Sequence, residues 1–162
     1  MAAAQSPVPP ELERARNNLK TKCESLSNNP VKEFYQEELR KAQCECTTAK
    51  FDALTPQEGE QDMTPRILRA VAECMAPVMR TGMRAICDGR IPMPPLAPEY
   101  KKPLCGCLDQ KESKISLQQW EDDVLKSFEM GEAHTPLLKV AMNECFKEVE
   151  AQMAAPKKKS RR

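Results

Sequence analysis

The sequence predicts an all-α protein made of two tandem four-cysteine helical repeats that form a disulfide-stapled helical bundle. Aromatic residues make up only 4% of the 162 residues, whereas Ala, Leu, Met, Glu, Lys and Gln, which favour helices, are plentiful. No stretch alternates apolar and polar residues for long enough to indicate a strand. The cysteines occur in the same order in both halves of the chain, which indicates an internal duplication.

The duplication is visible in the cysteines and in the residues around them. Each half reads Cys, a gap, Cys-x-Cys, a longer gap and a last Cys. The positions are Cys23, Cys44, Cys46 and Cys74 in the first half and Cys87, Cys105, Cys107 and Cys145 in the second. Residues 64–74 and 135–145 align without a gap at five identical positions, starting with Thr-Pro. The second half has ten extra residues between its Cys-x-Cys and its Thr-Pro.

The chain therefore divides into two repeats with flexible ends. We expect a flexible N-terminus over 1–10, repeat 1 over 11–80, repeat 2 over 81–155 and a flexible basic tail over 156–162. Each repeat should contain about four helices. The first carries Cys23 or Cys87, the second carries the Cys-x-Cys pair, a short one opens at Thr55 or Ser116, and a longer one opens at Thr64 or Thr135.

Capping residues and prolines mark the boundaries of these helices. Thr64 and Thr135 each place a hydroxyl directly before a proline, and proline is tolerated in the first helical turn because its missing N–H has no partner there. Pro30 marks the turn after the first helix, and the Pro-rich stretch 91–98 should form an extended connector. Residues 64–87 should form one helix bent at Pro77 and loosened at Gly82, with two separate helices as the alternative.

An even number of cysteines in a short chain is the usual mark of a disulfide framework. Residues two apart on a helix point about 200° away from each other, so the cysteines of a Cys-x-Cys pair should not bond to each other. Two pairings per repeat remain. In both, disulfides join the Cys-x-Cys helix to the helix before it and to the helix after it. Disulfides persist in oxidising compartments, which predicts a periplasmic or secreted protein. The alternative is a cytosolic protein with reduced cysteines.

No signal peptide and no membrane span is visible in the sequence, and we interpret the Ala-rich start as that of a trimmed, mature form. The Cys-x-Cys pairs are followed about eight residues later by Leu54 or Ile115, and then by Thr55-Pro56 or Ser116-Leu117-Gln118. This pattern resembles the small helical cysteine repeats of bacterial envelope proteins. The resemblance implies a periplasmic or secreted setting and transfers no site residues.

A soft-metal site is the alternative to the disulfides. Cysteine thiolates, together with the methionine stripe Met75, Met79 and Met83, are ligand types that suit Cu(I) or Zn(II). However, structural zinc sites favour wider cysteine spacings and often add histidine, and His134 is the only histidine. Methionines at helical spacing more often fill a core or line an adaptable groove, so we expect no metal and no other cofactor.

The sequence contains none of the motifs that mark common enzymes. Phosphate-binding Gly-rich loops, nucleophile elbows and metalloprotease helices are all missing, so we expect a non-catalytic protein. The acidic run Glu121, Asp122 and Asp123 is interpreted as solvated helix surface. His134 precedes a helix and could sense pH, but it is interpreted as an ordinary loop residue.

Protein–protein binding is the remaining function, as an adaptor, inhibitor or immunity-like factor. A groove between the two units and apolar anchors would make the contacts, and we expect Tyr100, Trp120, Met93 and Leu96 to bind the partner. The tail carries five positive charges that could contact polyanions weakly, without specific nucleic-acid recognition. These charges are Lys157, Lys158, Lys159, Arg161 and Arg162.

Overall fold

The structure is a computed structural model that describes residues 7–28, 37, 40–89 and 98–155. These residues form helices joined by turns and short loops, and no strand occurs among them, which confirms the all-α prediction. Several predicted features lie outside the described residues. They are the turn at Pro30, the connector over 91–97, the basic tail over 156–162 and most of the N-terminal segment.

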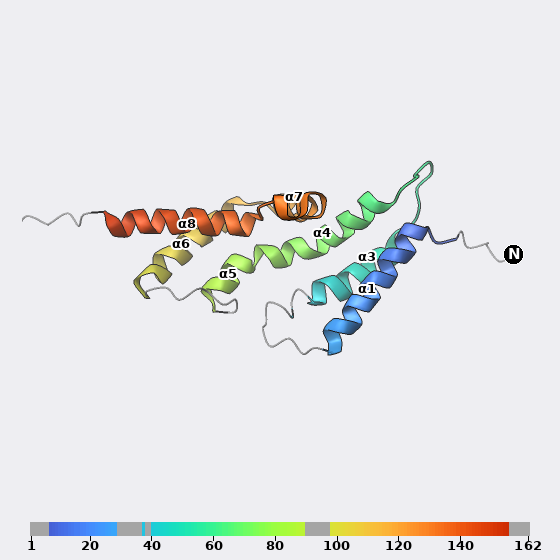
Figure 1. Ribbon diagram of the computed structural model, residues 1–162, viewed down its shortest axis with the longest axis horizontal. Coiled ribbons are helices and arrows are strands. Elements are labelled where there is room, and N and C mark those ends of the chain that lie inside the picture. Colours follow the sequence, from blue (N-terminus) through green and yellow to red (C-terminus); the bar gives the residue numbers. More distant parts are fainter. Residues whose placement is uncertain (1–6, 29–36, 38–39, 90–97, 156–162) are drawn as a thin grey trace, which may run out of the picture.

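The molecule is elongated, with the first helices of the chain together toward one end and the last helix toward the other (Figure 1). The first half contains α1 (Pro10–Asn28), the π-helical turn η1 (Ala42–Cys46), α3 (Thr47–Ala53) and α4 (Thr64–Arg80). The second half contains α5 (Gly82–Cys87), α6 (Pro98–Lys114), α7 (Leu117–Met130), the 3-10 turn η2 (Gly131–Ala133) and α8 (Leu137–Ala154). Pro98, which we expected in the extended connector, is instead the first residue of α6. A proline fits there because the first helical N–H has no partner within the helix.

All eight cysteines form disulfides, and each half follows the same order. The first cysteine of a half bonds the first of its Cys-x-Cys pair, and the second of that pair bonds the last cysteine. The bonds are Cys23–Cys44, Cys46–Cys74, Cys87–Cys105 and Cys107–Cys145, each with a Cα–Cα distance of 5.7 Å. The prediction that each Cys-x-Cys segment is bonded both backward and forward is confirmed, and one of the two possible pairings is selected.

Helix α4 belongs to both apolar cores of the molecule. The smaller core lies among α1, α3 and the start of α4, and it consists of Leu12, Phe51, Met63, Ile67 and Ala70. The larger core contains Ala76, Met83, Leu104, Leu108, Trp120, Ala141, Cys145 and Val149. Because α4 supplies side chains to each cluster, it connects the two ends of the molecule through packing as well as through the chain.

Small side chains on α4 allow α7 to pack closely across it. Ala72 and Ala76 have no exposed surface, and neither does Trp120 of α7, which lies in the same core as Ala76. Figure 1 looks nearly along the axis of α7, whereas α4 and α8 run across the view. The ten extra residues of the second half are therefore accommodated in a segment that contains a helix packed on α4 of the first half.

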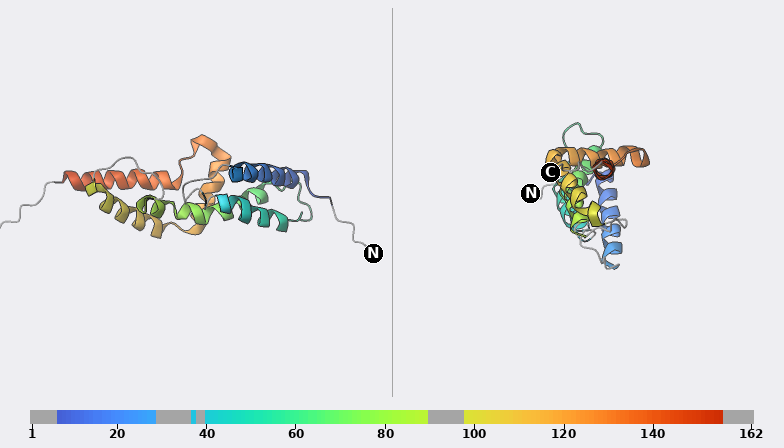
Figure 2. Two further views of the ribbon diagram at one scale, coloured as in Figure 1. Left: turned by 90° about the horizontal axis from the view of Figure 1, so that it is seen from below. Right: turned by 90° about the vertical axis from the view of Figure 1, so that its left-hand side faces the viewer.

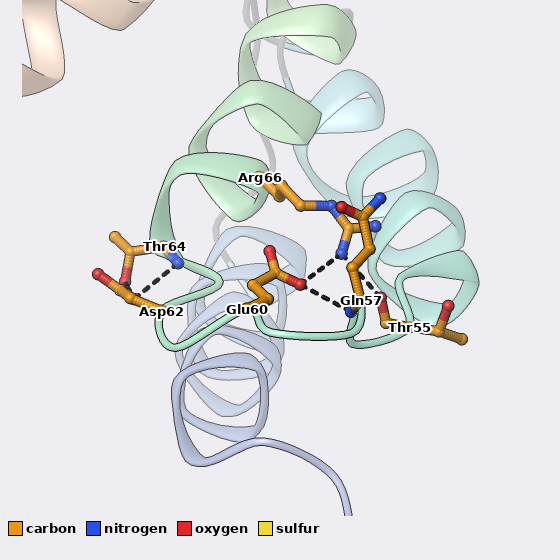
Figure 3. Close-up of polar contacts among 6 residues, drawn as sticks. All are labelled: Thr55, Gln57, Glu60, Asp62, Thr64 and Arg66. Carbon is orange, nitrogen blue, oxygen red and sulfur yellow. Dashed lines mark hydrogen bonds and ion pairs between the residues drawn. The ribbon is translucent and has the colours of Figure 1, made fainter.

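The predicted short helix at Thr55 does not form, and residues 54–63 are a loop. Figure 3 shows how side chains hold this loop. The Glu60 carboxylate accepts hydrogen bonds from the Gln57 N–H and from the Arg66 guanidinium, each at 2.9 Å, and Arg66 also donates to the Thr55 carbonyl at 2.7 Å. Gly59 adopts a φ of +79°, which ends any helical turn here. The prediction is wrong for Thr55 because Arg66 binds the loop in this non-helical shape.

The matching prediction at Ser116 is confirmed by a capping box. The Ser116 hydroxyl accepts a hydrogen bond from the Gln119 N–H at 3.2 Å, and the Gln119 side chain accepts one from the Ser116 N–H at 2.8 Å. This reciprocal pair satisfies two N–H groups that a helix leaves without internal partners. Helix α7 therefore begins where the sequence places it.

The predicted threonine caps are wrong, although both long helices begin close to the expected positions. At α4 the acceptor is Asp62, whose Oδ1 accepts from the Thr64 N–H at 2.9 Å and from the Thr64 hydroxyl at 2.6 Å (Figure 3). At α8 the Leu137 N–H donates to Asp123 Oδ1 at 3.1 Å, and no cap comes from Thr135. Asp62 and Asp123, which lie outside these helices, therefore accept the N–H hydrogen bonds that the threonine hydroxyls were expected to accept.

The expected bend at Pro77 is replaced by a break four residues later. Pro77 lies inside α4, and the helix is interrupted at Thr81, between α4 and α5. The Ala85 N–H still donates to the Thr81 carbonyl at 2.9 Å, so α5 begins directly. The two-helix alternative is therefore the correct one. Within the described ranges no helix combines the length and apolar character needed to cross a membrane.

The start of α4 gives a pH-dependent prediction. The hydroxyl and backbone N–H of Thr64 hold the pKa of Asp62 below its usual range, so the stability that Asp62 contributes is present near neutral pH and is lost as the pH falls through the folded pKa. Thr64→Ala should raise this pKa toward its usual value, as an NMR titration of the Asp62 carboxyl would show. Its destabilisation in urea unfolding should be larger at pH 7 than in acid. Thr21→Ala is the control, because that hydroxyl donates to the Asn17 carbonyl on α1. Equal titrations of Asp62 in the wild type and in Thr64→Ala would contradict the assignment.

The packing of α7 on α4 gives a second prediction. Ala76→Leu replaces a fully buried methyl group by an isobutyl group, and such overpacking costs about 1–3 kcal/mol of unfolding free energy. Ala49→Leu, at an exposed position on α3, should change the value by less than about 0.5 kcal/mol. Urea unfolding measures both. Wild-type stability of Ala76→Leu would show that α7 does not press on α4 at this point.

Candidate functional site

Helix α4 carries a second apolar stripe, of which Val71 also packs against the smaller core and Met79 against the larger core. Leu68, Val71, Met75 and Met79 follow one another at steps of three or four residues, and all four are half-buried. Residues at these steps lie on one face of a helix. The residues that the structure describes cover this stripe only in part, so α4 forms the apolar floor of a hollow.

Helices from both halves of the molecule form the walls of this hollow, which we call the α4 groove. It consists of two adjoining hollows of about 380 and 180 Å³ that share Gln43, Val71 and Phe128. On one side lie residues of α1, η1 and α3: Ala15, Asn18, Leu19, Lys22, Gln43, Thr47 and Phe51. On the other side lie residues of α7 and the start of α8: Asp123, Val124, Ser127, Phe128 and Pro136. The left view of Figure 2 shows α7 near the middle of the molecule, with α8 toward one end and α1 toward the other.

An exposed aromatic ring stands at the edge of the α4 groove. Phe128 borders both hollows and is 47% exposed. A large apolar side chain with this much exposure is informative when it continues an apolar hollow. The groove and its rim therefore form one continuous apolar surface.

Among the described residues, the charged side chains that line the groove are Lys22 and Asp123. Lys22 on the α1 wall makes no ion pair with any of the described residues. Asp123 on the α7 wall is 4% exposed and already engaged. Its Oδ1 lies 2.6 Å from His134 Nε2 and 3.1 Å from the Leu137 N–H. The groove therefore presents a positive charge on one wall and no free negative charge on the other.

The contacts of Asp123 correct the interpretation of the acidic run. We expected Glu121, Asp122 and Asp123 to form solvated surface, but Asp123 is buried and connects α7 to the start of α8. Glu121 is half-buried and lies 3.7 Å from the Arg69 guanidinium on α4. Asp122 alone fits the expectation, because it is exposed and accepts a hydrogen bond from Gln118. His134 is likewise more than an ordinary loop residue, since its ring holds Asp123.

The aromatic residues predicted as partner contacts lie elsewhere. Trp120 has no exposed surface and belongs to the larger core, so the prediction that it contacts a partner directly is wrong. Tyr100 is half-buried against the same core. Met93 and Leu96 lie outside the described residues, and so do the five charges of the basic tail.

The sulfur atoms proposed as metal ligands are used in other ways. Every cysteine sulfur is in a disulfide, so none is left as a thiolate, the form that binds metals. Met83 is fully buried in the core, whereas Met75 and Met79 border the α4 groove. Within the described ranges no group of three or more His, Cys, Asp or Glu side chains is placed to hold a metal ion. The methionines thus fill the core and groove roles expected of such a stripe.

A larger hollow of about 660 Å³ lies between α1 and α3, but its charges balance one another. Its charged lining residues are Arg16, Lys20, Glu24 and Asp52. Arg16 donates to the Phe51 carbonyl at 3.0 Å and lies 3.6 Å from the Asp52 carboxylate. The α4 groove, with its apolar floor and single free charge, is the better candidate for a functional site.

Sequence reasoning missed most residues of this site. It predicted a groove between the two units but placed the contacts on Tyr100, Trp120 and the connector, whereas the groove is formed by α4 residues with Lys22, Gln43 and Phe128. One feature could have indicated it: α4 is apolar at 67, 68, 70, 71, 74, 75, 78 and 79, which is more than one face of a helix.

Comparisons with known proteins find no match among family models, curated proteins or solved structures. The class of the protein therefore follows from its own fold. It is a disulfide-stapled, all-helical protein with an apolar groove on its central helix.

Asp123 provides a test of how the α7 wall is held. Asp123→Asn keeps an acceptor oxygen for the His134 ring and the Leu137 N–H but removes its charge, and a hydrogen bond to a neutral acceptor is weaker than one to a charged acceptor by about 1 kcal/mol. Urea unfolding should show this loss, while Asp122→Asn, at the exposed neighbour, should stay within about 0.5 kcal/mol of the wild type. Similar stabilities of the two variants would mean that the Asp123 contacts do not hold α7 to α8.

Proposed function

We propose that this chain is a non-catalytic binding protein of the bacterial periplasm or secreted fraction, acting as an adaptor, inhibitor or immunity-like factor. It binds another protein through the α4 groove. The observation that carries the proposal is the half-buried apolar stripe on α4 that lines the groove, because burial of the apolar surface that remains exposed is the main source of favourable free energy in association.

The four disulfides support the compartment. Disulfides form and persist in oxidising environments and are rare in the cytosol, where thiols are kept reduced. Here every cysteine is bonded, and each bond closes a loop of 18 to 38 residues in sequence separation. Both cores are small and bury little apolar surface. The disulfides therefore add stability that the cores alone do not provide.

The common order of bonding supports a tandem duplication as the origin of the fold. Each half has the same pairing of four cysteines, and the last helix of each half, α4 or α8, carries the last cysteine of the set. We propose that these are two copies of one unit. The copies then diverged where α7 packs, since Ala72 and Ala76 of α4 correspond to Asn143 and Lys147 of α8.

The construction of the groove walls supports a binding function. Both halves contribute to it, so the groove exists only in the assembled two-unit protein. The disulfides near its α1 wall and along α4 hold this surface in shape before any partner arrives, and a pre-formed surface lowers the conformational entropy lost on binding.

Site-specific photo-crosslinking in the source organism tests this function. A benzoylphenylalanine placed at Met75, on the floor of the groove, should form a discrete protein adduct, whereas the same group at exposed Gln152 on α8 should not. Phe128→Asp should reduce the Met75 adduct severalfold, because it places a charge at the apolar rim.

The matched control is Met130→Asp, which changes a side chain of similar exposure on the same helix end that does not line the groove. It should leave the adduct unchanged. Equal adducts at positions 75 and 152, or an adduct that Phe128→Asp leaves unaltered, would contradict the proposed function.

A further inference from the structure

We propose that the occupant of the α4 groove is an amphipathic helix of the partner protein that lies along α4 and places an acidic side chain against Lys22. This inference rests on the proposed function and deepens it by stating the form and charge of the partner. It is argued from the shape of the floor, the backbone of the walls and the charges of the lining.

The floor of the groove has the length of a short helix. From Leu68 to Met79 the stripe rises by about 17 Å, at about 1.5 Å per residue, which equals three helical turns. Apolar side chains at steps of three or four residues on the occupant would meet the stripe all along this length. A shorter or globular contact would leave part of the floor uncovered.

The walls exclude pairing through the backbone. All groove-lining residues except Pro136, which directly precedes α8, lie within helices whose N–H and C=O groups are bonded along the helix, and no sheet edge occurs among the described residues. An extended peptide gains its affinity by adding a strand to such an edge. A peptide bound here must satisfy its own backbone groups, and a helix does so internally.

The charged side chains that line the groove favour an occupant helix with an acidic side chain on one flank. Lys22 is the only charged side chain of the groove that makes no ion pair with the described residues, and Asn18, one turn before it on α1, adds an amide that can donate a hydrogen bond. The carboxylate of Asp123 is taken by His134 and Leu137, so the α7 wall offers no site for a basic flank. A glutamate or aspartate facing α1 is therefore favoured over a lysine.

Two fluorescent model peptides test the inference by anisotropy titration. Both are 15-residue helical sequences with leucines spaced to match the floor, and they differ only in carrying glutamates or lysines along one flank. We expect the wild-type protein to bind the glutamate peptide about threefold more tightly than the lysine peptide, the effect of an exposed ion pair. Lys22→Glu should reverse this preference.

Lys20→Glu is the matched control for the charge. It makes the same change on the same helix, but Lys20 borders the hollow between α1 and α3 and not the α4 groove. It should keep the preference of the wild type for the glutamate peptide. Equal binding of the two peptides by the wild type, or equal effects of Lys20→Glu and Lys22→Glu, would overturn the inference.

Two further outcomes separate this inference from the proposed function. If neither peptide binds while the crosslink at Met75 forms, the groove binds a protein but its occupant is not such a helix. If sedimentation shows a dimer that Phe128→Asp dissociates, the occupant is a second copy of the chain. Both outcomes overturn the helical occupant, and loss of the Met75 crosslink as well would remove the proposed function with it.

Discussion

The arrangement of the molecule depends on one helix, α4, being apolar on more than one face. One face supplies Ile67 and Ala70 to the smaller core, and another supplies Ala76 to the larger core. A third side, with Val71 and Met75, is half-buried and lines the α4 groove. Since an ordinary surface helix buries a single stripe, this composition makes α4 the element around which the others pack. The position of α7, the continuity of the two halves and the α4 groove all follow from it.

The sequence predicted the helices well where local chemistry decides the outcome. The helix start at Ser116 depends on residues close in sequence, and the bonding of each Cys-x-Cys pair both backward and forward follows from its spacing. The sequence left two pairings per repeat open, because both satisfy that spacing. The predictions at Thr55 and Thr135 were wrong because residues distant in the sequence make the hydrogen bonds that decide the structure there. Arg66 binds the loop after Thr55, and the Asp123 carboxylate receives the first N–H of α8. Contacts of this kind cannot be recognised from the pattern of apolar and polar residues in the sequence.

The candidate site was harder to predict than the fold because exposure, and not residue type, decides it. Trp120 is a residue type that often anchors interfaces, but the small alanines of α4 leave room for it to pack in the core. Phe128, eight residues later on the same helix, is the aromatic ring that stays exposed. Sequence alone cannot separate these two rings, since the difference arises from where α7 crosses α4. The acidic run shows the same effect, because Asp123 is buried and Asp122 is not.

The placement of the disulfides has a consequence for how the chain responds to cleavage. Two bonds lie within residues 23–74 and two within 87–145, and none crosses the stretch between. A protease that cut once inside either set of loops would leave the pieces covalently tethered. A single cut between 75 and 86 would instead yield two separate, internally crosslinked fragments, held together by non-covalent contacts such as the packing of α7 on α4 and the ion pair between Arg69 and Glu121. The peptide bonds on either side of Glu45 and of Gly106 also lie outside the four disulfide loops, so a cut there would separate the chain in the same way. After a cut between 75 and 86, the packing of α7 on α4 would keep the two halves associated.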